Sequence, residues 1–212
     1  MICVSLAKAS LAAYRLSLQE IDFAEIRLDL GPLSDKEIRL LFAMPKRLIA
    51  TYRPGRNNDS VRLASLSMAI EAGASFVDIE HDARPEYRQR LVGQAHGQRC
   101  RVIVSYHNEQ ETPDIKTLNS IIDQCRAHGA AVVKIACLAQ TPADNARLLG
   151  LLAIHRDLIV IGMGAYGTIT RLAGPLLGAP FTYAAEKTGA EVAPGQMDHV
   201  MMARILASLR HD

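Results

Sequence analysis

The sequence has few of the features that mark secreted, membrane-spanning or nucleic-acid-binding proteins. Its four cysteines form no CxxC pair and have no histidines at zinc-ligand spacing, and no apolar run is long enough to cross a bilayer. Acidic and basic residues nearly balance, at a formal net charge of +2, and the basic residues form no run. The first residues lack the basic region of a signal peptide. We therefore expect reduced thiols, a cytoplasmic location, and neither a membrane nor a nucleic acid as a partner.

What is present is a regular alternation of short apolar runs and longer amphipathic segments. The 212 residues allow one large domain or two small ones, and 49% of them are hydrophobic, enough for a real core. Eight runs read as strands, namely residues 2–6, 23–30, 47–53, 76–81, 101–107, 132–136, 158–164 and 181–184. Helices are expected at 8–20, from Ser34, and at 60–71, 85–96, 112–128, 141–155, 168–177 and 194–209. Ser34 and Glu37 have capping-box spacing, and Pro113 and Pro142 are expected at first helical positions.

This order of elements predicts the fold. Eight strand–helix units with no break in composition favour a parallel sheet, because each parallel connection needs a crossover helix. Eight is the number of units in a (β/α)8 TIM barrel, and the chain is near the lower size limit of that fold. We therefore predict a single α/β barrel domain over residues 1–212. A doubly wound open sheet is the alternative.

One lysine lies within a buried strand. Lys134 interrupts the apolar run 131–136, where an unpaired ammonium would cost several kcal/mol or lose its proton. A lysine with a lowered pKa is also the residue that attacks ketones to form Schiff bases. The alternative is that Lys134 ends its strand and reaches solvent or a carboxylate.

Polar residues recur with strand periodicity at the ends of other runs. They are Glu25, Arg27 and Asp29; Thr51 and Arg53; Asp78 and Glu80; and Ser105 and His107. Each by itself is ordinarily a rim residue or part of an ion pair. Both faces of a parallel sheet are covered, so together these residues are predicted to line one enclosed site at the carboxyl ends of the strands.

This set of groups fits a particular chemistry. A neutral lysine amine adds to a ketone, and the resulting iminium acidifies the neighbouring carbon. His107 could remove that proton and later protonate a leaving hydroxyl, while Arg27 and Arg53 could hold hydroxyls or a carboxylate. A nucleotide is only weakly indicated by the GxGxxG pattern from Gly162 to Gly167, with Glu186 near the distance of a ribose-binding acid.

Over nearly its whole length the chain resembles the type I 3-dehydroquinate dehydratases of the shikimate pathway. The matching motifs are Glu25-Ile-Arg27-Leu-Asp29, Thr51-Tyr-Arg53, Asp78-Ile-Glu80, Val104-Ser-Tyr-His107, Val133-Lys134-Ile-Ala136, Arg171 and Ala193-Pro-Gly-Gln196. The resemblance implies a barrel, a homodimer, no metal or cofactor, and syn-elimination of water from 3-dehydroquinate to 3-dehydroshikimate.

The resemblance also implies roles for single residues. Lys134 would be the Schiff-base lysine, His107 the general acid/base and Arg171 the partner of the substrate carboxylate. Further substrate contacts would come from Glu25, Arg27, Arg53 and Gln196, with Met163 and Tyr183 flanking the ring.

The chain departs from the family pattern in the segments that flank this site. Asn57 stands about where the family has a glutamate that can hydrogen-bond the catalytic histidine, and an amide cannot stabilise an imidazolium as a carboxylate does. Val192 replaces a serine, which removes one substrate hydrogen bond. The segment 186–191 is longer than usual, which suggests an altered lid.

Two other functions are therefore considered. One is a different Schiff-base lyase on the same barrel, such as an aldolase, although no glycine cluster for a phosphate follows the eighth strand. The other is a non-catalytic relative that binds the same ligand. The expensive Lys134 argues against the second.

Overall fold

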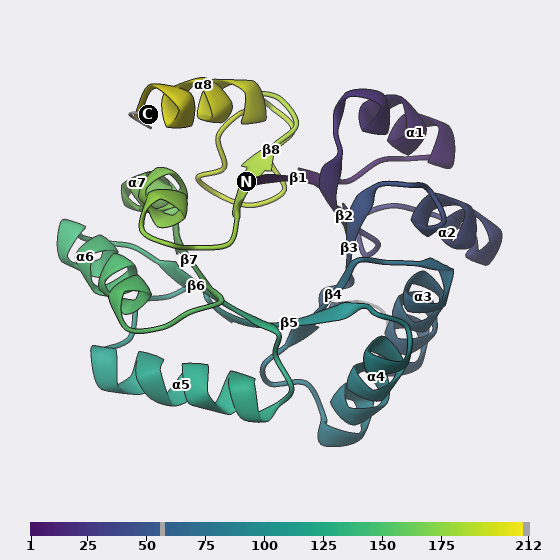
Figure 1. The fold of residues 1–212 in the computed structure, drawn as a ribbon, viewed down its shortest axis with the longest axis horizontal. Coiled ribbons are helices and arrows are strands. Elements are labelled where there is room, and N and C mark those ends of the chain that lie inside the picture. The colour runs from purple at the N-terminus through teal and green to yellow at the C-terminus, as the bar shows by residue number, and fades with distance from the viewer. Residues whose placement is uncertain (56–57, 210–212) are drawn as a thin grey trace.

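The computed structural model describes residues 1–55 and 58–209. Eight parallel strands surround a central axis and alternate with eight α-helices on the outside (Figure 1). The strands are β1 Ile2–Leu6, β2 Phe23–Arg27, β3 Arg47–Thr51, β4 Phe76–Glu80, β5 Arg101–Asn108, β6 Val132–Leu138, β7 Leu158–Met163 and β8 Thr182–Ala185. Hydrogen bonding runs in the order β7-β6-β5-β4-β3-β2-β1-β8. Within the described chain no ladder joins β7 to β8, so the barrel is nearly closed, and the predicted TIM-barrel fold is confirmed.

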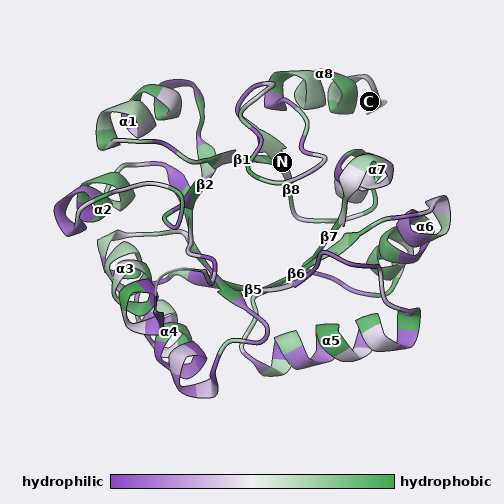
Figure 2. Cartoon of the chain, turned by 180° about the vertical axis from the view of Figure 1, so that it is seen from behind, coloured by the Kyte–Doolittle hydropathy of each residue, from purple (hydrophilic) through white to green (hydrophobic). Residues whose placement is uncertain are grey.

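The helices form the outer ring. They are α1 Leu11–Glu20, α2 Asp35–Phe42, α3 Asp59–Ala72, α4 Pro85–Gly97, α5 Ile115–Ala127, α6 Pro142–Gly150, α7 Gly164–Leu176 and α8 His199–Leu209, with a short 3-10 helix η1 at Leu151–Ala153. Their apolar faces pack on the outward side chains of the strands (Figure 2). Within the described residues, no helix has the length and apolarity needed to span a membrane.

Local chemistry explains most of the helix starts. The Ser34–Glu37 capping box is confirmed, and so is Pro142 in the first turn of α6. The predicted start at Pro113 is wrong: α5 begins at Ile115, because the Asp114 carboxylate accepts the amides of the first turn and makes Asp114 the N-cap.

Two helix boundaries near the carboxyl terminus also differ from prediction. Helix α7 begins at Gly164, directly after β7, and not near Thr168. Helix α8 begins at His199 rather than Pro194, which leaves residues 186–198 as an irregular segment between β8 and α8. Gly195 in this segment adopts φ +77°, and a Cβ there would lie 2.7 Å from the carbonyl oxygen of Gly164. The segment therefore packs directly on the start of α7 and cannot continue as helix.

Inside the barrel the side chains are arranged in layers along the strands. Phe23 and Phe76, the first residues of β2 and β4, meet Phe181, which directly precedes β8, and the Phe23 and Phe181 rings lie edge to face with centroids 4.9 Å apart. Two residues farther along β2 and β4 the inward positions are Glu25 and Asp78, both buried. An apolar plug thus fills one end of the barrel and leaves polar side chains at the carboxyl ends of the strands.

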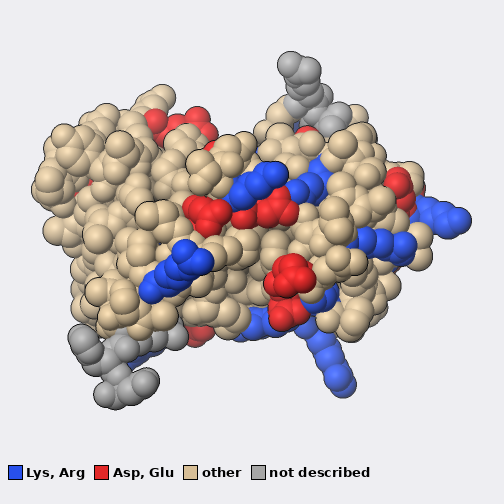
Figure 3. Space-filling view, turned by 90° about the horizontal axis from the view of Figure 1, so that it is seen from above, with Lys and Arg blue, Asp and Glu red and all other residues tan. Residues whose placement is uncertain are grey.

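The outer surface has a different character. On the face that includes α8 and α1, acidic and basic side chains of the described residues lie next to each other and do not gather in a patch of one sign (Figure 3).

Candidate active site

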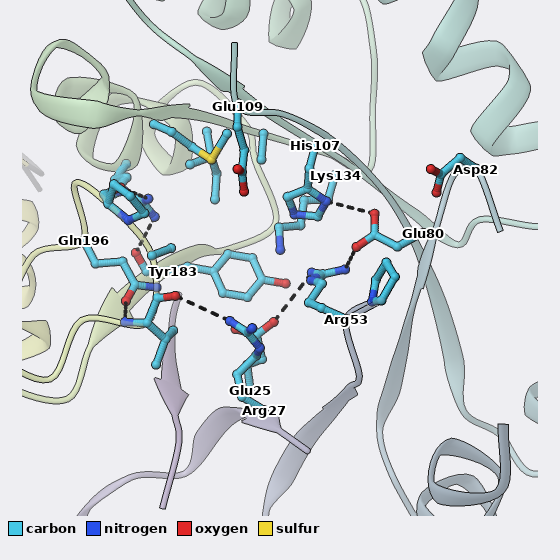
Figure 4. A pocket seen from close by; sticks show the side chains of 18 residues that line it. Glu25, Arg27, Arg53, Glu80, Asp82, His107, Glu109, Lys134, Tyr183 and Gln196 are labelled. Atoms are coloured by element: carbon cyan, nitrogen blue, oxygen red, sulfur yellow. Dashed lines mark hydrogen bonds and ion pairs between the residues drawn. The ribbon is translucent and has the colours of Figure 1, made fainter. Parts of the chain in front are cut away.

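A pocket of about 440 Å³ opens at the carboxyl ends of the strands. All nine residues to which the family resemblance gave roles line it (Figure 4), whereas Asp29, Thr51, Asp78 and Ser105, which strand periodicity also placed in the site, are not among the lining residues. The nine are Glu25, Arg27, Arg53, His107, Lys134, Met163, Arg171, Tyr183 and Gln196. They come from five strands, from the residues just after β3, from α7 and from the segment before α8, so only barrel closure brings them together.

Lys134 is buried in the middle of β6, as predicted, and does not reach bulk solvent. Its Nζ lies 3.6 Å from Asp78 Oδ2 and 4.4 Å from the centroid of the Tyr183 ring. Within the described chain it donates no hydrogen bond. The amine is therefore held between a carboxylate and an aromatic face, with its remaining directions open to the pocket.

The surroundings of Lys134 favour its neutral form. Burial is the largest influence and, with the Arg53 guanidinium, lowers the pKa of Lys134 from its ordinary value, while Asp78 and Glu25 act in the opposite direction. A lowered pKa makes the free amine more available near neutral pH, as nucleophilic attack requires.

His107 is oriented by Glu80. The ring Nδ1 lies 3.0 Å from Glu80 Oε2. Although burial raises the pKa of Glu80, Arg53 and His107 together hold it below its usual value, so the carboxylate is ionised and can only accept a hydrogen bond. Nδ1 therefore carries the proton, and Nε2 is left free to exchange protons with a ligand in the pocket.

The pKa of His107 itself is lowered. Burial is the main cause and Arg53 adds to it, whereas the hydrogen bond to Glu80 raises the pKa. The imidazole is consequently neutral at neutral pH, which is the form that acts as a base.

Arg53 hydrogen-bonds to the acidic residues that lie next to Lys134 and His107. Its Nη1 donates to Asp78 Oδ1 at 2.8 Å, to Ser105 Oγ at 2.9 Å and to Glu80, and its Nη2 donates to Asp78 Oδ2 at 3.0 Å. Burial raises the pKa of Asp78, but Arg53 and Lys134 outweigh it and hold that pKa below its usual value. One guanidinium thus fixes the two carboxylates that face Lys134 and His107.

Glu25, on the neighbouring strand β2, has its Oε1 4.0 Å from Arg53 Nη2 and lies within a layer of hydroxyl groups. Ser5 donates to its Oε2 at 2.8 Å and Thr51 to its Oε1 at 3.0 Å. The Gln196 amide donates to Ser5 Oγ at 3.1 Å, and its oxygen accepts the backbone N–H of Val192 at 2.9 Å. The first bond therefore holds the segment before α8 against β1, and the second is internal to that segment.

Arg27 and Arg171 are held in contrasting ways. Arg27 forms a bidentate pair with Asp29, at 2.9 and 2.6 Å. Arg171, only 2% exposed, donates to the carbonyl oxygens of Tyr183 and Pro194, and its Nε lacks a partner within the described chain. Burial lowers the pKa of Arg171 to about 10, so it stays charged at neutral pH. Arg171 is thus a buried cation beside the edge of β8 that faces β7, and among the described residues it pairs with no carboxylate.

Some contributors to the site could not be recognised from sequence motifs. Ser5 is one of them, a small hydroxyl residue on β1 whose inward register was the only available signal, whereas Thr51 and Ser105 were already predicted from strand periodicity. Asp82 and Glu109 follow β4 and β5 at the mouth of the pocket, and Figure 4 shows the Glu109 carboxylate directed into it. Asn57, the residue expected near the histidine, lies outside the described residues; Glu80 supplies the carboxylate partner of His107.

The GxGxxG pattern has a packing role. A Cβ on Gly167 would lie 2.1 Å from the carbonyl carbon of Gly162, so these glycines allow the first turn of α7 to pack in direct backbone contact with β7. Glu186 is engaged by Lys8 and Ser17. In the part of the chain that the structure describes, no group of three His, Cys, Asp or Glu residues is placed to hold a metal ion.

Comparisons with known proteins agree with this geometry. A family model described as Type I 3-dehydroquinase matches residues 2–212. A 3-dehydroquinate dehydratase of Methanothermobacter thermautotrophicus is 34% identical over 200 residues, covering 89% of this chain and 85% of that protein. The Thermococcus onnurineus protein of the same name is 33% identical over 201 residues, covering 92% and 91%. A crystal structure of a type I 3-dehydroquinate dehydratase from Clostridium difficile has a TM-score of 0.87 at 24% identity, covers 98% of this chain and 91% of its own, and supports the fold.

Proposed function

Because this chain belongs to the type I 3-dehydroquinase family, we propose that it converts 3-dehydroquinate to 3-dehydroshikimate through a Schiff base on Lys134. The chain is an enzyme, a hydro-lyase. The observation that carries the mechanism is the Lys134 amine, buried, without a hydrogen bond in the described chain, and open to a pocket that His107 also lines.

In the proposed reaction the neutral Lys134 amine attacks the substrate ketone, and loss of water gives an iminium. The iminium acidifies the adjacent carbon, and His107 Nε2 takes a proton from it. The electron pair then expels the hydroxyl group one carbon farther along, and His107 returns its proton to that leaving group. Hydrolysis of the conjugated iminium releases the product and restores Lys134.

The remaining pocket residues are proposed to hold the substrate. Arg171 carries a charge that no carboxylate of the described chain neutralises by direct pairing, so it is suited to the substrate carboxylate. Glu25, Arg27, Arg53 and Gln196 surround the rest of the pocket and are placed to contact hydroxyl groups, with Met163 and Tyr183 against the ring. A homodimer in the cytoplasm that works without metal or cofactor completes the proposal.

The direct test is to incubate the protein with 3-dehydroquinate and follow the ultraviolet absorbance of the conjugated enone. We expect enone formation from 3-dehydroquinate and no cleavage of sugar phosphates, because no glycine cluster for a phosphate follows the eighth strand. Binding of 3-dehydroquinate without enone would contradict the proposal and favour the non-catalytic alternative. Cleavage of a sugar phosphate would favour the aldolase.

The pH dependence of the reaction should move when Glu80 is replaced by glutamine. The Glu80 carboxylate raises the pKa of His107 against burial and Arg53, and glutamine keeps an acceptor for Nδ1–H without the charge. The pKa of His107 should therefore fall further, and the acid limb of kcat/KM, where the base becomes protonated, should shift to lower pH by about 0.5 to 1 unit.

This shift is measured by the pH profile together with an NMR titration of the His107 ring. The Glu86→Gln variant, on an exposed turn of α4, serves as the control and should leave both curves in place. A shift of the His107 titration to higher pH in Glu80→Gln would show that Glu80 does not stabilise the imidazolium.

A further inference from the structure

The segment between β8 and α8, residues 186–198, forms one wall of the pocket. Val192, Pro194 and Gln196 line it. Three hydrogen bonds join this wall to the barrel at the pocket: Gln196 donates to Ser5 Oγ at 3.1 Å, Arg27 Nη1 to the carbonyl oxygen of Val192 at 3.5 Å, and Arg171 Nη2 to the carbonyl oxygen of Pro194 at 3.3 Å. The position of the segment therefore sets the width of the pocket above Glu25.

At its base the segment is held by Glu186, the first residue after β8. One carboxylate oxygen forms an ion pair with Lys8 Nζ, and the other accepts the Ser17 hydroxyl. Lys8 lies in the connection from β1 to α1, and Ser17 lies on α1. The Lys8 and Glu186 side chains are only 21% and 17% exposed, so their pairing is less screened by water than that of a surface pair.

Glu186 also joins the two ends of the segment. Its carbonyl oxygen lies 2.7 Å from His199 Nδ1 at the start of α8, and the amide of Ala185 donates to the carbonyl oxygen of Met197 at 2.8 Å. The segment is thus closed at its neck, and the neck is held to α1 and the residues before it, while β8 itself pairs with β1 (Figure 1).

The two fastenings share one piece of chain. Ser5, which accepts the hydrogen bond from Gln196, lies only three residues before Lys8, which forms the ion pair with Glu186. Gln196 and the neck belong to the same short closed segment. A shift of the neck relative to residues 5–8 would therefore move Gln196 relative to Ser5.

We propose that Glu186, through Lys8 and Ser17, is a positioning residue for the site: it holds the neck of the 186–198 segment so that Gln196 and the Val192 carbonyl stay against Ser5 and Arg27. The proposal rests on the function proposed above for its kinetic readout. Glu186 touches no substrate in this role, and its effect is on binding, since the wall it fixes carries neither Lys134 nor His107.

The test is a double-mutant cycle with Glu186→Gln, Lys8→Met and the double variant, in which KM and kcat for 3-dehydroquinate are measured. Each single change should raise KM about fivefold with a smaller effect on kcat, and the double variant should resemble the singles, because both remove the same contact. Glu71→Gln, which removes the exposed ion pair with Arg39 between α2 and α3, is the matched control and should leave KM unchanged.

Amide hydrogen exchange of residues 187–198 gives a readout that does not depend on the reaction. It should accelerate in both single variants and not in Glu71→Gln. Unchanged KM and unchanged exchange, or effects that add in the double variant, would overturn the proposal, as would a lowered Tm with KM unaltered, which marks a purely structural pair. If the wild type does not turn over 3-dehydroquinate, the proposed function fails while the exchange data still decide the role of Glu186.

Discussion

Replacing Lys134 with alanine should abolish dehydration, with a loss of kcat of roughly 10⁴-fold or more, because no other amine of the described residues lines the pocket. The expected Schiff base can be trapped directly. Borohydride treatment in the presence of 3-dehydroquinate should leave a stable adduct on the wild-type protein, and peptide mapping should place it on Lys134.

Lys116→Ala, on an exposed turn of α5, is the matched control and should retain both activity and adduct. Appreciable turnover by Lys134→Ala, or an adduct elsewhere in the chain, would contradict the Schiff-base role. Absence of an adduct from a folded, substrate-binding wild type would do the same.

The same lysine gives a prediction about stability that separates function from folding. Lys134→Met keeps most of the side-chain volume and removes a desolvated amine, while Asp78 keeps its bidentate partner Arg53. The Tm should therefore stay equal or rise, since a buried ammonium costs more than its pairing returns. A clear fall in Tm would show that the ammonium contributes to the fold.

Replacing His107 with alanine should lower kcat by roughly 10²- to 10⁴-fold, the range expected for loss of a general acid/base. Nucleophilic attack by Lys134 does not require His107 Nε2 to take the substrate carbon proton. The borohydride adduct on Lys134 should therefore still form, which distinguishes loss of proton transfer from loss of the pocket.

His96→Ala, at the exposed end of α4, is the control and should behave as the wild type. Loss of both adduct and turnover in His107→Ala, with the fold intact, would show that the histidine is needed for binding or for iminium formation. Unchanged kcat would remove it from the mechanism.

Much of the site could be inferred from strand periodicity. Glu25 with Arg27, and Ser105 with His107, are separated by one residue on a strand, so each pair must point to the same side of the sheet. Helix ends were harder to predict from the sequence. Asp114 is the N-cap of α5 and leaves Pro113 outside the helix, because an aspartate cap and a helical proline compete for the same few residues.

The pairing of charges inside the barrel could not be predicted from residues that are neighbours in the sequence. Arg53 could be placed on the inner face of the barrel, but its sharing between Asp78 and Glu80 depends on the order and register of β3, β4 and β5. The pairing of Glu80 with His107 follows from the same strand order and register.

The sequence by itself determined the eightfold strand–helix alternation, the inward face of each strand and the placing of Lys134 in a buried run, since hydrophobic periodicity and burial cost act within a few residues. Tertiary structure alone decided which charges meet, where the 186–198 segment lies and that Glu186 holds it to Lys8. Those contacts join residues distant in sequence, up to 191 residues apart for Gln196 and Ser5, and exist only because barrel closure sets β8 beside β1.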